Sequence, residues 1–78
     1  MTNQIVRREI LKIVENQIRA NDPAITRSTL ERLIATGHSR GHAIEMIGAV
    51  VAEEIWRILA KDKEFDLERY SRLLSTLE

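Results

Sequence analysis

The sequence predicts an all-α fold, a compact four-helix bundle with the third helix at its centre. Apolar residues recur at intervals of three and four, which is the spacing of one helix face. Candidate caps and breaks divide the chain into helices at about 3–20, 23–36, 40–61 and 67–77, and no segment reads as a strand. A chain of 78 residues has room for one core, so residues 1–78 are expected to form a single helical domain.

The first predicted helix, over 3–20, is amphipathic. Val6, Ile10 and Val14 recur at helical spacing, and charged side chains take the opposite face. Pro23 disfavours helical geometry at the residue before it, so the helix is expected to end in the segment that leads to this proline.

The second predicted helix has two candidate starts. Asp22 could be the N-cap with Pro23 at the first helical position, where the missing amide costs nothing. Ser28 and Glu31 could instead form a capping box. One apolar stripe continues across both candidate starts, which favours the earlier one and a helix over 23–36.

A tight hairpin is predicted between the second and third helices. Gly37 follows the second helix, and glycine adopts most readily the left-handed conformation that ends a helix. Ser39 is placed as the N-cap of the helix over 40–61. That helix is apolar on most of its circumference, which indicates that other helices surround it. Gly48 in its middle costs about 1 kcal/mol relative to Ala and suggests that another backbone crosses closely there.

The fourth predicted helix begins after a charged break. Asp66 is its expected N-cap, and Phe65 and Tyr70 stand at the two positions of a hydrophobic staple. Tyr70, Leu74 and Leu77 give this helix, over 67–77, its buried stripe.

Composition restricts the location and the class of partner. The chain has no cysteine, no leader-like start and no apolar run near the roughly 20 residues that cross a bilayer. We therefore expect a cytoplasmic protein with no membrane contact. Residues 1–40 hold seven basic and four acidic side chains, and 41–78 hold five and eight, so the halves carry +3 and −3. This dipole suits packing between protomers and supplies no broad basic face for nucleic acid.

Several segments resemble small uncharacterised bacterial proteins that form a domain of unknown function. The similar segments are Thr29–Ser39, Ala43–Ile44, Ala52–Trp56 and the run from Phe65 to Tyr70. The resemblance covers about the last two thirds of the chain. It implies a helical fold and no activity, so it assigns no site residue.

A shorter stretch is similar to the helix-loop-helix of ubiquitin-associated domains. Leu33, Gly37, Ser39 and Ala43 have the spacing of such a hairpin. Thr36 and His38 replace the methionine and aromatic residue through which those domains make contact. The similarity therefore implies a helical hairpin and leaves ubiquitin binding without its usual residues.

Two groups of residues are candidates for a metal site or for acid–base chemistry. His38, His42 and Glu45 have a spacing that could hold a divalent metal on one helix, but a Ser39 cap places His38 outside that helix. Glu54 falls at the edge of the core, where a carboxylate either acts in acid–base chemistry or pairs with a cation from another helix. We expect solvated histidines, a paired Glu54, no metal or cofactor, and no enzymatic activity.

Protein–protein interaction, including formation of a homodimer, is the function that the sequence favours. Large apolar side chains are left over on the outer side of the third helix, interleaved with charged ones, and Trp is a common interface anchor. The expected interface residues are Met46, Val50, Trp56, Glu53 and Arg57. The alternatives are a nucleic-acid-binding adaptor of the helix-turn-helix type, and a small metal or ligand site near His42.

Overall fold

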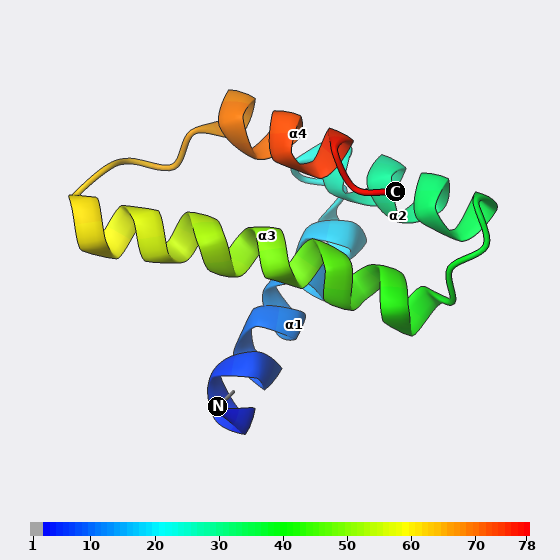
Figure 1. The fold of residues 1–78 in the computed structure, drawn as a ribbon, viewed down its shortest axis with the longest axis horizontal. Helices are drawn as coiled ribbons and strands as arrows, with labels where there is room; N and C mark the ends of the chain where they lie inside the picture. The colour runs from blue at the N-terminus through cyan, green and yellow to red at the C-terminus, as the bar shows by residue number, and fades with distance from the viewer. Residues whose placement is uncertain (1–2) are drawn as a thin grey trace.

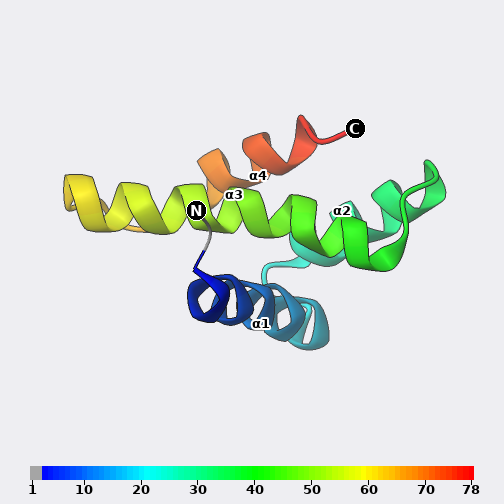
Figure 2. The same cartoon turned by 60° about the horizontal axis from the view of Figure 1, so that its bottom comes forward.

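The computed structural model describes residues 3–78 and contains four helices and no strand in that range (Figure 1). They are α1 (Gln4–Ala20), α2 (Ala24–Ala35), α3 (Arg40–Lys61) and α4 (Leu67–Ser75). The long helix α3 packs against all three others, with α1 on one side and α4 on another (Figure 2). The all-α fold with a central third helix is confirmed. None of the helices within 3–78 is long and apolar enough to cross a membrane.

The turn between α1 and α2 differs from the prediction. Asn21 adopts a left-handed conformation with φ 53°, and its amide and that of Asp22 donate to the last carbonyls of α1. Asp22 is therefore held in the closing turn of α1 and does not cap α2. Pro23 takes the N-cap position after a cis peptide bond, and α2 begins at Ala24. The earlier of the two candidate starts is right to within one residue, but Asp22 as its cap is wrong.

The hairpin between α2 and α3 has the predicted geometry. Gly37 has φ 113°, a conformation that a side chain would strain. The amide of Gly37 donates to Ile34 O and that of His38 to Leu33 O, which satisfies carbonyls at the end of α2. Ser39 then caps α3, because its hydroxyl accepts from the His42 amide at 3.1 Å.

Helix α4 begins as expected and ends earlier. The Asp66 carboxylate accepts from the Arg69 amide at 3.0 Å, and the rings of Phe65 and Tyr70 lie 5.5 Å apart, so the cap and the staple are both present. The regular helix stops at Ser75 and not at 77. Arg32 of α2 donates to the carbonyls of Leu74 and Leu77, and this tertiary contact takes the place of a further helical turn.

The core joins side chains from all four helices. Its buried apolar members are Val14, Leu30, Leu33, Ala43, Ile44, Ile47, Val51, Tyr70 and Leu74. Helix α1 crosses α3 at Gly48, where an added Cβ would lie 3.3 Å from Leu11 Cδ2 and 3.5 Å from Ile10 Cγ2. A neighbouring helix is close at Gly48, but side chains of α1 make the approach, so the predicted backbone crossing is wrong.

Candidate functional site

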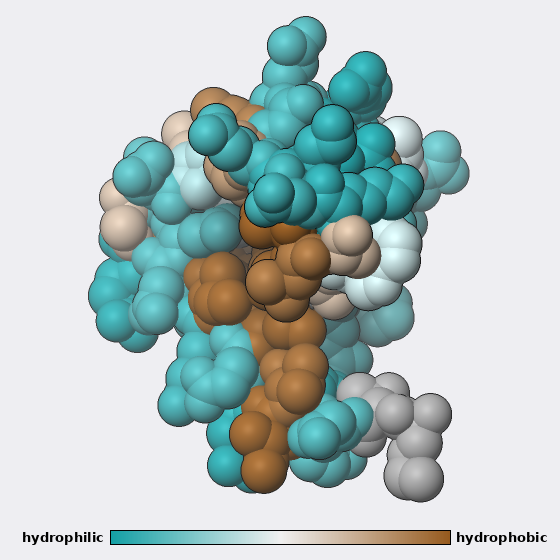
Figure 3. All heavy atoms as spheres, turned by 90° about the vertical axis from the view of Figure 1, so that its left-hand side faces the viewer, coloured by the Kyte–Doolittle hydropathy of each residue, from teal (hydrophilic) through white to brown (hydrophobic). Residues whose placement is uncertain are grey.

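One face of the molecule carries a band of exposed apolar side chains. Figure 3 shows it running from the middle of that face towards the N-terminal end of α1. Large exposed apolar side chains come from three elements: Ile13 of α1 is 37% exposed, Leu59 of α3 is 80% exposed, and Phe65 of the α3–α4 linker is 50% exposed. Single exposed apolar residues are common on proteins, whereas a continuous group of large ones marks an interaction surface.

These residues are neighbours and not scattered points. Ile13, Ile55 and Phe65 line the same cleft. Leu59 lies one helical turn from Ile55 and three residues from Trp56, which is 58% exposed, so the surface continues along α3. We call these five residues, Ile13, Ile55, Trp56, Leu59 and Phe65, the apolar band.

The structure separates the five interface residues expected from the sequence. Met46 and Val50 are half-buried and pack against the core, while Trp56 and Glu53 are exposed. Arg57 is half-buried, and its Nη1 atom has no hydrogen-bond partner within residues 3–78. Of this group, Trp56 alone belongs to the apolar band. The ammonium group of Lys61 lies 5.8 Å from the centre of the Trp56 ring, within the range of a cation–π contact.

Glu54 forms part of a small cleft beneath the apolar band. The cleft has a volume of about 110 Å³ and is walled by Ile13, Gln17, Val51, Glu54, Ile55, Ile58, Phe65 and Tyr70. The Glu54 side chain is 3% exposed, and its Oε1 atom accepts from Arg69 Nε at 2.9 Å. The other oxygen, Oε2, is buried and accepts no hydrogen bond from the described residues. The predicted pairing with a cation of another helix is therefore present, but the carboxylate lies inside the protein and not at the rim.

A buried polar cluster lies beside this cleft. The hydroxyls of Thr26 and Tyr70 both donate to Gln17 Oε1, at 2.7 and 2.9 Å, and lie 3.2 Å from each other. Burial raises the pKa of the Tyr70 phenol; the hydrogen bond with Thr26 lowers it by a smaller amount, and the charge of Glu54 raises it further. The cluster ties α1, α2 and α4 together and fixes one side of the cleft.

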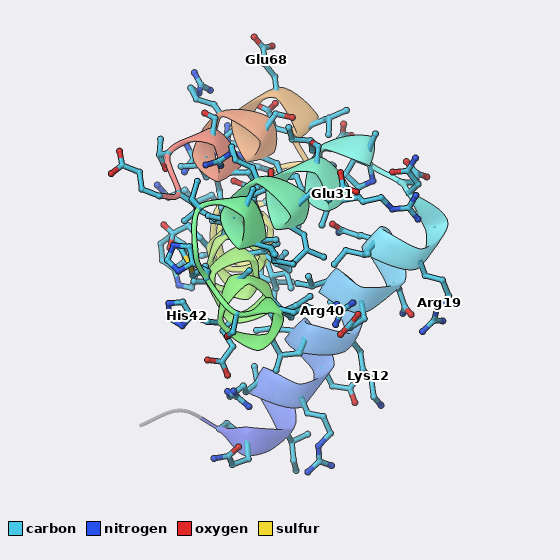
Figure 4. All side chains as sticks on the ribbon, turned by 90° about the vertical axis from the view of Figure 1, so that its right-hand side faces the viewer. Lys12, Arg19, Glu31, Arg40, His42 and Glu68 are labelled. Atoms are coloured by element: carbon cyan, nitrogen blue, oxygen red, sulfur yellow. The ribbon has the colours of Figure 1, made fainter. Side chains whose placement is uncertain are left out.

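The histidines lie at the opposite end of α3. The rings of His38 and His42 stack with their centres 5.2 Å apart, and His38 Nε2 is 2.9 Å from the carbonyl oxygen of Glu78. Glu45, the third residue of the candidate metal group, instead pairs with Arg7. In the part of the chain that the structure describes, no three His, Asp or Glu residues come together in a way that could hold a metal ion. His42 points away from the bundle (Figure 4).

Arg40, at the start of α3, is held against α1 (Figure 4). Its two terminal nitrogens donate to the two carboxylate oxygens of Glu15 at 2.9 and 3.0 Å. This bidentate bond lowers the pKa of Glu15 and raises that of Arg40. In a helix-turn-helix reading Arg40 would face a DNA base, but here its guanidinium is already occupied.

Sequence reasoning did not find Gln17, Thr26 or Arg69. A signal was present for the first two, because each is a polar residue on the apolar stripe of its helix: Gln17 follows Val14 by three positions, and Thr26 precedes Leu30 by four. A polar residue on such a stripe is buried and needs a hydrogen-bond partner. Arg69 lies beside the stripe of α4 and gives no such signal.

Comparisons with protein-family models, with curated proteins and with solved structures found no match.

Proposed function

We propose that this protein is a protein–protein interaction module that associates with itself as a homodimer through the apolar band. The observation that carries the proposal is the exposure of Ile13, Trp56, Leu59 and Phe65, with Leu59 80% exposed, around the cleft that Ile13, Ile55 and Phe65 line. Contacts with water are unfavourable for side chains of this size, so a partner that covers them is stabilised.

The free energy gained by burying the band, compared with the cost of association, supports a symmetric dimer. Burying one large apolar side chain contributes about 1.5–3 kcal/mol, while association costs at least about 4 kcal/mol of lost freedom. In a two-fold dimer each band residue is buried twice, once on each copy. The band of one copy then supplies the apolar surface that covers the other, and Trp56 and Phe65 are residue types that commonly anchor interfaces.

We propose no catalytic role. The one buried carboxylate of the cleft, Glu54, is engaged by Arg69. The cytoplasmic location expected from the composition stays a prediction.

Sedimentation equilibrium at micromolar concentration tests the dimer. We expect the purified chain to show twice its mass of 9.0 kDa, and Leu59→Glu to shift the protein to the monomer. Leu59 is so exposed in the single chain that a charge there leaves the fold intact. Ile34→Glu is the matched control, because Ile34 is an exposed apolar residue of α2 outside the band. A wild-type monomer, or a dimer that both variants retain, would refute the proposal.

A further inference from the structure

Oε2 of Glu54 is a buried acceptor without a donor. A carboxylate oxygen inside a protein loses its water and is strongly destabilising unless a hydrogen bond replaces that water. Arg69 satisfies Oε1 but leaves Oε2 unbonded. The hydrogen bonding of this carboxylate is therefore incomplete in the single chain.

The volume and the lining of the cleft indicate which kind of group can donate a hydrogen bond to Oε2. Its volume of about 110 Å³ is several times the roughly 15 Å³ that one water needs, so it admits the end of a side chain. Four of the wall residues are apolar side chains of α1 and α3, namely Ile13, Val51, Ile55 and Ile58. A hydrogen-bond donor at the tip of an apolar stem fits such a cleft, and a lysine side chain has both parts.

Lys63 is placed to supply that group in a dimer. It is exposed, lies in the linker two residues before Phe65, and makes no ion pair or hydrogen bond within residues 3–78. Lys61, by contrast, already lies over the Trp56 ring. Because Phe65 belongs both to the cleft and to the apolar band, Lys63 is next to the surface through which the proposed dimer forms.

We infer that Lys63 of the partner subunit enters the cleft and that its ammonium group donates to Oε2 of Glu54, with the reciprocal contact made on the other copy. This inference rests on the proposed homodimer and names the polar contact that fixes its register. In an isologous interface a donor and an acceptor on the same face meet twice, so one residue pair contributes two contacts.

Two arginines of the same chain, Arg69 and Arg57, lie near Glu54, but neither donates a hydrogen bond to its Oε2 atom. The Arg69 side chain is 33% exposed, so water partly screens its charge, and it binds the opposite oxygen. Arg57 lies three residues further along α3, and neither its buried Nη1 atom nor Glu54 Oε2 has a hydrogen-bond partner, so the two do not satisfy each other. A charge-assisted hydrogen bond from a compact ammonium group is therefore still available to Oε2.

A double-mutant cycle on the dimer dissociation constant tests the contact. The variants are Glu54→Gln, Lys63→Gln and the two combined, with Lys12→Gln as the control because Lys12 is an exposed lysine of α1 that does not line the cleft. We expect each single change to weaken the dimer at least tenfold, the combination to weaken it no further, and the control to leave it unchanged. Lys63 is exposed, so Lys63→Gln remains informative even where Glu54→Gln impairs folding.

The results that would contradict the contact between Lys63 and Glu54 differ from those that would contradict the homodimer. A wild-type dimer in which the two changes act additively, or in which Lys63→Gln has no effect, overturns the contact and leaves the proposed function standing. A coupling that appears in the unfolding of the dilute monomer also overturns it, because Lys63 would then reach Glu54 of its own chain. A wild-type chain that never dimerises refutes the proposed function itself.

Discussion

Arg69 Nε donates to Glu54 Oε1 at 2.9 Å, and this bond joins α4 to the buried side of α3. The arginine remains one-third exposed while the glutamate is almost completely buried. The pair therefore places a carboxylate inside the bundle at the cost of its hydration, with one cation reaching in from the surface. A carboxylate buried in this way is strongly destabilising once its partner is removed.

Removing the arginine is expected to cost more than removing both groups. In Arg69→Met the Glu54 carboxylate stays buried without a partner, and the free energy of unfolding should fall by about 2 kcal/mol, less than for a fully buried pair because Arg69 is partly exposed. Adding Glu54→Leu should recover part of that loss. Urea denaturation of the single and double variants measures both values. If the double variant is the less stable of the two, the carboxylate is not the source of the cost.

Any side chain at Gly37 is expected to lower the stability of the fold. Its φ of 113° strains any L-residue, so Gly37→Ala should lower the free energy of unfolding by about 1–2 kcal/mol. Gly41→Ala is the matched control, because that helical glycine has no strained φ and an added Cβ there meets nothing within 4 Å. We expect the control to raise stability by up to about 1 kcal/mol. Chemical melts that give both variants the same sign would contradict the hairpin geometry.

Ionisation of the Tyr70 phenol is expected to lower the stability of the fold at high pH. Its pKa in the folded protein is raised above the ordinary value of 10.0, so the folded state holds the proton more tightly than the unfolded chain does. The stabilisation is complete below pH 10 and falls as the pH rises above that value. Tyr70→Phe should reduce this alkaline loss, although it also removes the hydrogen bond to Gln17. The free energy of unfolding of wild type and of Tyr70→Phe is measured at pH 8 and at pH 10.5. If both proteins lose the same amount of stability between these pH values, the phenol is not responsible.

The Glu15–Arg40 pair is expected to change the stability of the fold at acidic pH. Because Arg40 lowers the pKa of Glu15 below its ordinary value of 4.5, the pair stabilises the fold above that pH and loses its effect as the pH falls through the lowered value. Glu15→Gln should therefore lower stability at pH 6 and have little effect at pH 2. Glu53→Gln serves as the control, since Glu53 is exposed and forms no ion pair among the described residues. A loss of equal size at both pH values would show that the charge of Glu15 is not involved.

Local interactions explain why so much of the fold could be predicted. The Ser39 cap, the left-handed Gly37 and the staple between Phe65 and Tyr70 each involve residues within five positions of one another. Their geometry follows from backbone sterics and from the unpaired groups of helix ends, which are the same in any helical protein. The turn at Asp22 was mispredicted because Asn21, one residue earlier, had already begun to close α1.

The candidate site could not be predicted from local patterns, because it is built from contacts between residues far apart in the sequence. Glu54 meets Arg69 across 15 positions, and Gln17 meets Tyr70 across 53. A helical pattern shows which face of α3 is apolar, but only the packing of α1 and α4 decides which apolar residues it covers. Met46 and Val50 are half-buried, and Leu59 is left 80% exposed. The sequence by itself determined the four helices and most of their ends; the tertiary structure decided where the buried carboxylate and the exposed apolar band lie, because both result from surfaces that meet only after folding.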